Sequence, residues 1–136
     1  MSEHIAFIGG GNMASAIIGG LIKQGLSPEL IDVVEPFAPA QAKLQASFGI
    51  AAQPEAGAFL HHSALVVWAD KPQSFQQAAQ TVAPHTARAL HLSVAAGIRS
   101  DSIAAWLGTQ RIVRAMPNTP ALIGQGISGL YARAVV

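Results

Sequence analysis

A glycine-rich turn near the start of the chain constrains its fold most strongly. The apolar run Ile5–Ile8 leads into Gly9-Gly10-Gly11-Asn12-Met13-Ala14, and a stretch rich in Ala, Ile and Leu follows. Strand, glycine turn and helix in this order form the corner of a fold that binds a dinucleotide pyrophosphate. We expect Gly9 to turn the chain tightly, Gly11 to let a phosphate approach the main chain, and Ala14 to let helix and sheet pack closely. The N–H groups and positive dipole end of the helix would face the anion. The alternative is a tight strand–helix turn that binds nothing.

The amino-acid composition limits the classes of protein to which the chain can belong. A chain of 136 residues fits one domain, and we expect a single NAD(P)-binding domain over residues 1–136. Hydrophobic residues make up 51% and charged residues 11%, which suggests that a partner or further chain covers part of the surface. Eight basic against seven acidic residues, without a basic cluster, argue against nucleic acid or an anionic membrane as partner. The absence of cysteine and of a visible signal peptide favours the cytoplasm.

Short apolar runs alternate with helical patterns along the chain. The expected strands are Ile5–Ile8, Leu30–Val34, Ile50–Ala52, Ala64–Ala69, Ala89–Val94, Arg111–Ala115 and Gly126–Val136. The expected helices are Asn12–Gln24, Pro39–Phe48, Glu55–Leu60, Pro72–Val82 and Ser100–Leu107. This alternation predicts right-handed βαβ units and therefore a doubly wound α/β fold with a mostly parallel, Rossmann-type sheet.

In such a sheet, ligands lie outside the carboxyl ends of the strands, so the residues that follow each strand are the candidates. Glu35 follows the second expected strand, 26 positions beyond Gly9. Its carboxylate can accept hydrogen bonds from the adenosine ribose and would repel a 2′-phosphate, which favours NAD over NADP. An ordinary solvated glutamate at a strand end is the alternative.

Three later strand ends carry further candidates. Asp70-Lys71-Pro72 starts a helix at the edge of the expected cleft, and Ser93-Val94-Ala95-Ala96-Gly97 is small enough for a flat ring to lie against its backbone. Met116-Pro117-Asn118-Thr119-Pro120 is held by two prolines, so the Asn118 amide would have a fixed direction. The alternatives are an exposed helix-start lysine at Lys71 and a capping role for Asn118.

The other polar residues give no catalytic pattern. The five histidines lack metal-ligand spacing with acidic partners, so we expect no metal site. Ser93 has no evident His or Asp support for nucleophilic catalysis.

Four segments together closely resemble pyrroline-5-carboxylate reductase, and the resemblance runs through essentially all of the chain. They are Phe7–Ala14, Lys71-Pro72-Gln73, Ser93–Gly97 and Arg114–Ala121. The resemblance implies an oxidoreductase of proline biosynthesis that reduces 1-pyrroline-5-carboxylate, a small imine, to L-proline. Hydride would pass from C4 of the reduced nicotinamide to the ring carbon of the C=N bond.

The resemblance also implies a set of cofactor contacts and no metal. They fall on Gly9, Gly10, Gly11, Asn12, Met13, Glu35, Ala69, Asp70, Lys71, Pro72, Ala95, Ala96, Gly97 and Asn118. Asn118 would lie near nicotinamide and substrate without donating the proton, and no catalytic residue of this chain is implied. The family usually has a small hydroxyl residue in place of Glu35, which suits NADPH, so the cofactor is either NADP or NAD. It also usually reads Ala-Val-Lys-Pro where this chain has Asp70 in second place.

The family has a second, all-helical domain that dimerises and completes the imine site, and we expect it to lie outside these 136 residues. Homo-oligomers are expected for the full-length enzyme. Since orientation of the reactants contributes about 7–11 kcal/mol, the 136-residue chain alone is expected to bind cofactor with little or no turnover. The alternatives are a non-catalytic dinucleotide-binding module, or another reductase with the same N-terminal domain, such as an F420-dependent NADP reductase or a β-hydroxyacid dehydrogenase. The loop at Met116–Pro120 argues against the other reductases.

Overall fold

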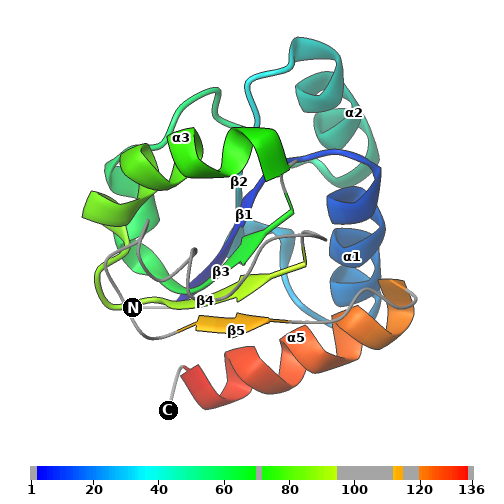
Figure 1. Ribbon diagram of the computed structural model, residues 1–136. Coiled ribbons are helices and arrows are strands. Elements are labelled where there is room, and N and C mark those ends of the chain that lie inside the picture. Colours follow the sequence, from blue (N-terminus) through cyan, green and yellow to red (C-terminus); the bar gives the residue numbers. More distant parts are fainter. Residues whose placement is uncertain (1–2, 70–71, 95–111, 115–119, 135–136) are drawn as a thin grey trace.

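A computed structural model of the chain describes residues 3–69, 72–94, 112–114 and 120–134. Within these ranges, five parallel strands form one sheet in the order β2-β1-β3-β4-β5 (Figure 1). The strands are β1 (His4–Ile8), β2 (Ile31–Val34), β3 (Ser63–Trp68), β4 (Leu90–Ser93) and β5 (Ile112–Arg114). The chain passes from β1 to β2 on one side and returns to place β3 on the other side of β1. This reversal of strand order is where ligands bind in doubly wound sheets.

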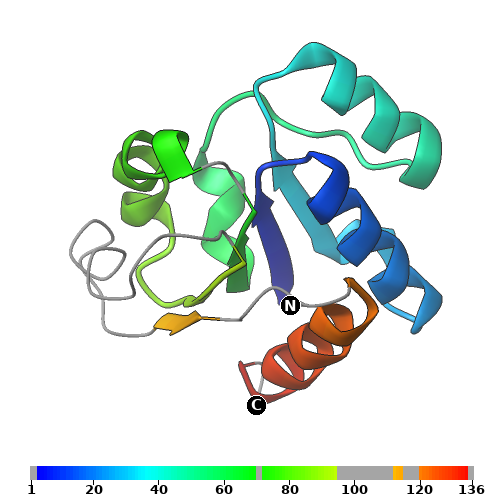
Figure 2. The same ribbon diagram turned by 45° about the vertical axis from the view of Figure 1, so that its right-hand side comes forward.

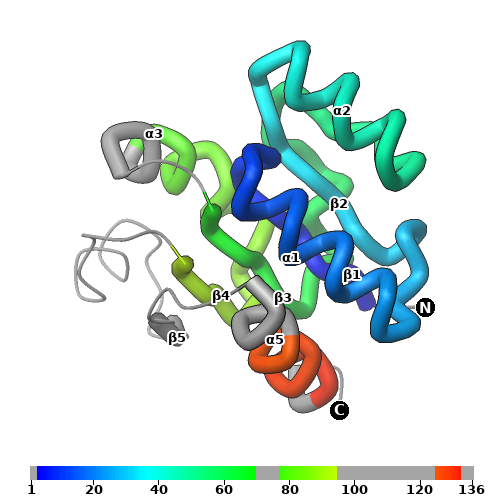
Figure 3. Tube along the Cα trace, turned by 90° about the vertical axis from the view of Figure 1, so that its right-hand side faces the viewer, coloured from blue at the N-terminus to red at the C-terminus, as the bar shows by residue number. Residues whose placement is uncertain are grey.

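Helices cover both faces of the sheet (Figure 2). One face carries α1 (Asn12–Lys23), α2 (Ala38–Phe48) and α5 (Pro120–Ala134), and α1 lies beside α5 (Figure 3). The other face carries α3 (Pro72–Val82) and the short 3-10 helices η2 (Ala58–His62) and η3 (Ala83–His85). A further 3-10 helix, η1 (Pro28–Leu30), precedes β2. The predicted doubly wound α/β fold is thus confirmed.

Alternate side chains of the strands belong to two separate apolar clusters. Ile5 and Phe7 of β1 pack with the buried face of α1, whereas Ala6 and Ile8 pack on the side of α3. All six residues of β3 are buried, because this central strand is covered on both faces. The uninterrupted apolar run that predicted this strand is therefore explained by its place in the middle of the sheet.

Three expected elements differ in the structure. Ile50–Ala52 is not a strand. Among the described residues, the next residue, Gln53, forms an isolated parallel bridge with Val34, and Pro54 follows at once and cannot donate to a ladder. The helix expected at Glu55–Leu60 is replaced by η2, three residues further along.

The strand expected at Gly126–Val136 is also wrong, because the chain is helical through α5. Ile127 is buried, and Leu130 and Tyr131 pack against the same cluster. Their spacing of three and four residues is that of one helix face. The expected helix Ser100–Leu107 lies outside the described residues.

Asp32, on β2, gives a prediction for the pH dependence of stability. Its pKa is raised from the ordinary value of 3.8, mainly because burial desolvates the carboxylate, while His4, 2.9 Å away, and His62 act in the opposite direction. The folded chain thus holds this proton more tightly than the unfolded chain does, so the contribution of Asp32 to stability falls as pH rises from 3.8 through the raised pKa.

We therefore expect the difference in unfolding free energy, wild type minus Asp32→Asn, to decrease over that pH range by less than about 1 kcal/mol. Urea unfolding of both chains at a series of pH values measures it. A difference that grows with pH would contradict a raised pKa of Asp32 in the folded chain.

Candidate functional site

The carboxyl ends of β1, β2 and β3 are in register, so the residues that follow them meet at one place. Ile8 is paired with Val34 on one side and with Trp68 on the other. The Gly9 N–H donates to the Val34 carbonyl, and the Ala69 N–H donates to the Ile8 carbonyl, each at 2.9 Å. The glycine turn therefore lies at the point where the strand order reverses, as the sequence predicts.

Glycine suits each of the three positions of the turn for a different physical reason. Gly9 has φ of 101°, a left-handed conformation that favours glycine. A Cβ on Gly10 would lie 2.8 Å from Leu44 Cδ1 and 3.2 Å from Glu35 Cβ, so the turn, α2 and the end of β2 pack too closely for a side chain. A Cβ on Gly11 would meet nothing within 4 Å among the described residues, so this side of the turn is open to a ligand. The role of Gly10 in packing is not evident from the sequence.

The start of α1 offers donors to an anion. Gly11 is the N-cap, and no side chain in the described part of the chain caps the helix. The first amides of α1 have no partner within the helix, and the helix dipole is positive at this end. Lys43 from α2 donates to the Asn12 side-chain oxygen at 3.4 Å, which brings a cation to the same corner. The corner thus has the electrostatics of a phosphate site.

Glu35 is fixed at the end of β2 by main-chain donors. Its Oε1 accepts the Gly10 N–H at 2.9 Å, and its Oε2 accepts the Phe37 N–H at 2.9 Å. The Gln41 side-chain amide donates to the Glu35 carbonyl at 2.6 Å. Each carboxylate oxygen can still accept another hydrogen bond. Glu35 is thus a half-buried, oriented acceptor beside the glycine turn, rather than a freely solvated side chain.

A cleft of about 540 Å³ opens beside Glu35. Its lining residues come from the ends of β1 and β2, the segment before η2 and one face of α3: Ile8, Val34, Glu35, Pro36, Pro54, Glu55, Ala56, Gln77, Ala78 and Thr81. Apart from Glu35, sequence reasoning missed these residues as site candidates. Two sequence signals could have indicated the cleft. They are the helical spacing of Gln77 and Thr81, and the prolines that follow the extended segments.

The structure describes only some of the remaining residues that the sequence predicts as cofactor contacts. Asp70, Lys71, the segment 95–97 and Asn118 lie outside the described residues, whereas Pro72 begins α3. The Val94 N–H donates to the Trp68 carbonyl at 3.0 Å, so β4 ends beside β3. Met13 is 36% exposed at the first turn of α1.

Two further features of the described residues concern metal ions and membranes. They contain no group of three His, Cys, Asp or Glu side chains that could hold a metal ion. None of the helices in these ranges is long and apolar enough to span a lipid bilayer.

Comparison with known proteins gives a family and a set of relatives. Residues 4–97 match the family described as NADP oxidoreductase coenzyme F420-dependent. A pyrroline-5-carboxylate reductase of Pseudomonas aeruginosa is 45% identical over 99% of this chain and 50% of its own length. That of Escherichia coli is 37% identical over 100% of this chain and 52% of its own length. The chain spans about half the length of the curated relatives it matches.

Solved structures agree with this pattern. A pyrroline-5-carboxylate reductase from Coxiella burnetii has a TM-score of 0.82 and 27% identity, covering 99% of this chain and 57% of its own. The Plasmodium falciparum enzyme with NADP bound has a TM-score of 0.73 at 22% identity, covering 90% of this chain and 45% of its own, which supports the fold alone. The resemblance noted in the sequence is confirmed.

Proposed function

Because the chain belongs to the family of NADP oxidoreductases described as coenzyme F420-dependent, we propose that it binds a reduced nicotinamide dinucleotide for a pyrroline-5-carboxylate reductase. The observation that carries the proposal is the open glycine turn beside an oriented carboxylate at the reversal of strand order. The reductase relatives, which match nearly the whole chain, supply the reaction. The substrate would be the small imine 1-pyrroline-5-carboxylate and the product L-proline.

The pyrophosphate would lie on the N–H groups at Gly11, Asn12 and Met13, with Gly9 and Gly10 shaping the turn. The adenosine would occupy the cleft of about 540 Å³, with its ribose hydroxyls on Glu35. The position of the cleft, which adjoins the turn and shares Glu35 with it, supports this proposal.

The nicotinamide half of the cofactor would extend toward the ends of β3, β4 and β5. Ala69, Asp70, Lys71 and Pro72 would line one side of it, and the segment 95–97 and Asn118 the other. The cofactor supplies the hydride, and this chain supplies binding and orientation. The proposal assigns no proton donor to the described residues.

We also propose where the full enzyme acts, its oligomeric state and the part that this chain plays in it. The full enzyme would act in the cytoplasm as a homo-oligomer, and the 136 residues would serve as one dinucleotide-binding domain. The second candidate is a reductase of the same family with another substrate, which the family description favours.

Calorimetric titration of the chain with NADH and with NADPH tests binding, and NAD(P)H oxidation driven by 1-pyrroline-5-carboxylate tests the reaction. We expect saturable 1:1 binding and little or no turnover by the 136-residue chain, with turnover in a chimera that carries the second half of the P. aeruginosa relative. Binding without turnover in that chimera would favour the second candidate or a non-catalytic module. No binding would overturn the proposal.

A further inference from the structure

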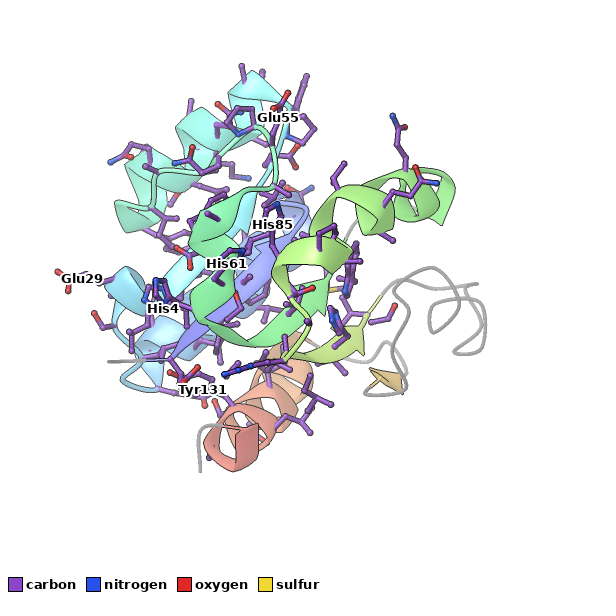
Figure 4. All side chains as sticks on the ribbon, turned by 90° about the vertical axis from the view of Figure 1, so that its left-hand side faces the viewer. His4, Glu29, Glu55, His61, His85 and Tyr131 are labelled. Atoms are coloured by element: carbon purple, nitrogen blue, oxygen red, sulfur yellow. The ribbon has the colours of Figure 1, made fainter. Side chains whose placement is uncertain are left out.

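The cleft beside Glu35 combines flat apolar surfaces with a few hydrogen-bonding side chains. Six of its lining residues are apolar, and the polar ones are Glu35, Glu55, Gln77 and Thr81. In Figure 4, Glu55 lies at the upper edge of the molecule, and His4, the first residue of β1, lies well below it, as expected for a cleft at the carboxyl ends of the strands. Apolar surfaces suit the face of a nucleotide base, whereas the edge of the base needs polar partners.

Two of these polar side chains come from one face of α3. Gln77 and Thr81 are four residues apart, which places their Cβ atoms about 5–6 Å from each other on the same side of the helix. Both are exposed where they line the cleft. Ala79 and Val82 of the same helix are fully buried against the sheet. Packing therefore fixes the direction in which α3 presents its polar face.

The two side chains differ in what they offer to a ligand. The Thr81 hydroxyl donates its single proton to the Ala78 carbonyl at 2.9 Å, so its Oγ1 accepts from any group in the cleft. The Gln77 amide holds an acceptor oxygen and a donor NH₂ group side by side. The carboxylates of Glu35 and Glu55 add further acceptors. The side chains of the described lining are thus rich in acceptors, and the Gln77 amide is the group that also donates.

This pattern matches one edge of adenine and mismatches the same edge of hypoxanthine. Adenine presents an amino group at C6 beside the acceptor N7, and a glutamine amide pairs with both atoms. The second proton of the amino group remains for another acceptor. Hypoxanthine has a carbonyl oxygen at C6, so this edge carries two acceptors and no donor. An acceptor-rich lining therefore favours adenine.

We propose that Gln77 selects the base of the dinucleotide: its amide pairs with the 6-amino group and N7 of adenine, and Thr81 Oγ1 accepts the second amino proton. The inference rests on the proposed function, which places adenosine in this cleft. It adds a selection that acts on the base, apart from the selection of Glu35 at the ribose. NADH and NADPH carry the same base, so Gln77 treats them alike. The alternative is a solvated glutamine that contacts no base.

Titration with NADH and with reduced nicotinamide hypoxanthine dinucleotide tests the inference, because the two compounds differ only in the base. We expect the chain to bind NADH at least about 5-fold more tightly, the equivalent of about 1 kcal/mol. Gln77→Leu should lower NADH affinity and bring the two affinities within about 2-fold of each other. NADPH affinity should fall in this variant by the same factor as NADH affinity.

Gln80→Leu is the matched control. Gln80 is also exposed on α3 but lies outside the lining of the cleft, so its loss should leave the ratio of the two affinities unchanged. Backbone amide spectra establish that each variant is folded. Equal affinities of the unmodified chain for the two compounds would overturn the inference and leave the proposed function standing, as would an unchanged ratio in Gln77→Leu or an equal loss in Gln80→Leu. If neither compound binds, the proposed function fails and the inference fails with it.

Discussion

A Gly11→Ala substitution is expected to weaken binding of NADH and NADPH alike by about 10–100-fold while leaving the fold almost as stable. The added methyl group meets nothing within 4 Å among the described residues, and the backbone at φ −76° and ψ −161° is open to alanine. It would stand where a phosphate approaches the first amides of α1. Loss of one charge-assisted hydrogen bond there corresponds to about 1.5–3 kcal/mol. Calorimetric titration measures the binding, and urea unfolding should change by about 1 kcal/mol or less.

Two other glycines provide matched controls for this prediction. Gly20→Ala also adds a methyl group that meets nothing within 4 Å, but in the interior of α1, so stability should rise by up to about 1 kcal/mol without loss of binding. Gly10→Ala should instead destabilise the fold by about 1–3 kcal/mol, because its Cβ would lie 2.8 Å from buried Leu44. Unchanged cofactor affinity in Gly11→Ala would show that no phosphate lies on this turn.

Local sequence signals were sufficient to predict the strands and helices around the glycine turn. The four apolar residues before Gly9 and the apolar run Ala64–Trp68 of β3 are typical of buried parallel strands, and both strands were predicted. The ends of α1 and α2 were also predictable, because Gly25 and Gly49 follow them with φ of 108° and 70°. Since ligands bind at the strand ends of such sheets, predicting the strands also predicted that Gly9 and Glu35 lie together at the candidate site.

Features that depend on contacts between distant segments could not be predicted. The stretch Gly126–Val136 combines glycines with β-branched residues and favours a strand locally, but packing of Ile127 beside α1 determines a helix. The cleft beside Glu35 depends on how α3 lies relative to Pro54. The two main-chain donors to Glu35 likewise come from the fold of the turn, not from a residue pattern.

Replacing Glu35 by glutamine is expected to lower the ratio of NADH to NADPH affinity by roughly 5–150-fold, which corresponds to about 1–3 kcal/mol. The carboxylate would accept the ribose hydroxyls of NADH and repel the 2′-phosphate of NADPH. Glutamine keeps the shape of the side chain and removes its charge. Because Oε1 and Oε2 each accept a main-chain N–H, the amide of glutamine retains only one of these bonds, so some NADH affinity is lost as well. Titration with both cofactors at one ionic strength measures the ratio.

Glu55→Gln is the control that separates position from charge. Glu55 lines the same cleft and is exposed, so its replacement removes the same charge from another position in the cleft lining. Solvent screens an exposed carboxylate, and the ratio should change by less than about 3-fold, the equivalent of under 1 kcal/mol. Equal shifts in the two variants would mean that the net charge of the cleft selects the cofactor. No shift in folded Glu35→Gln would assign Glu35 to holding Gly10 and the turn, and the ribose would then have another partner.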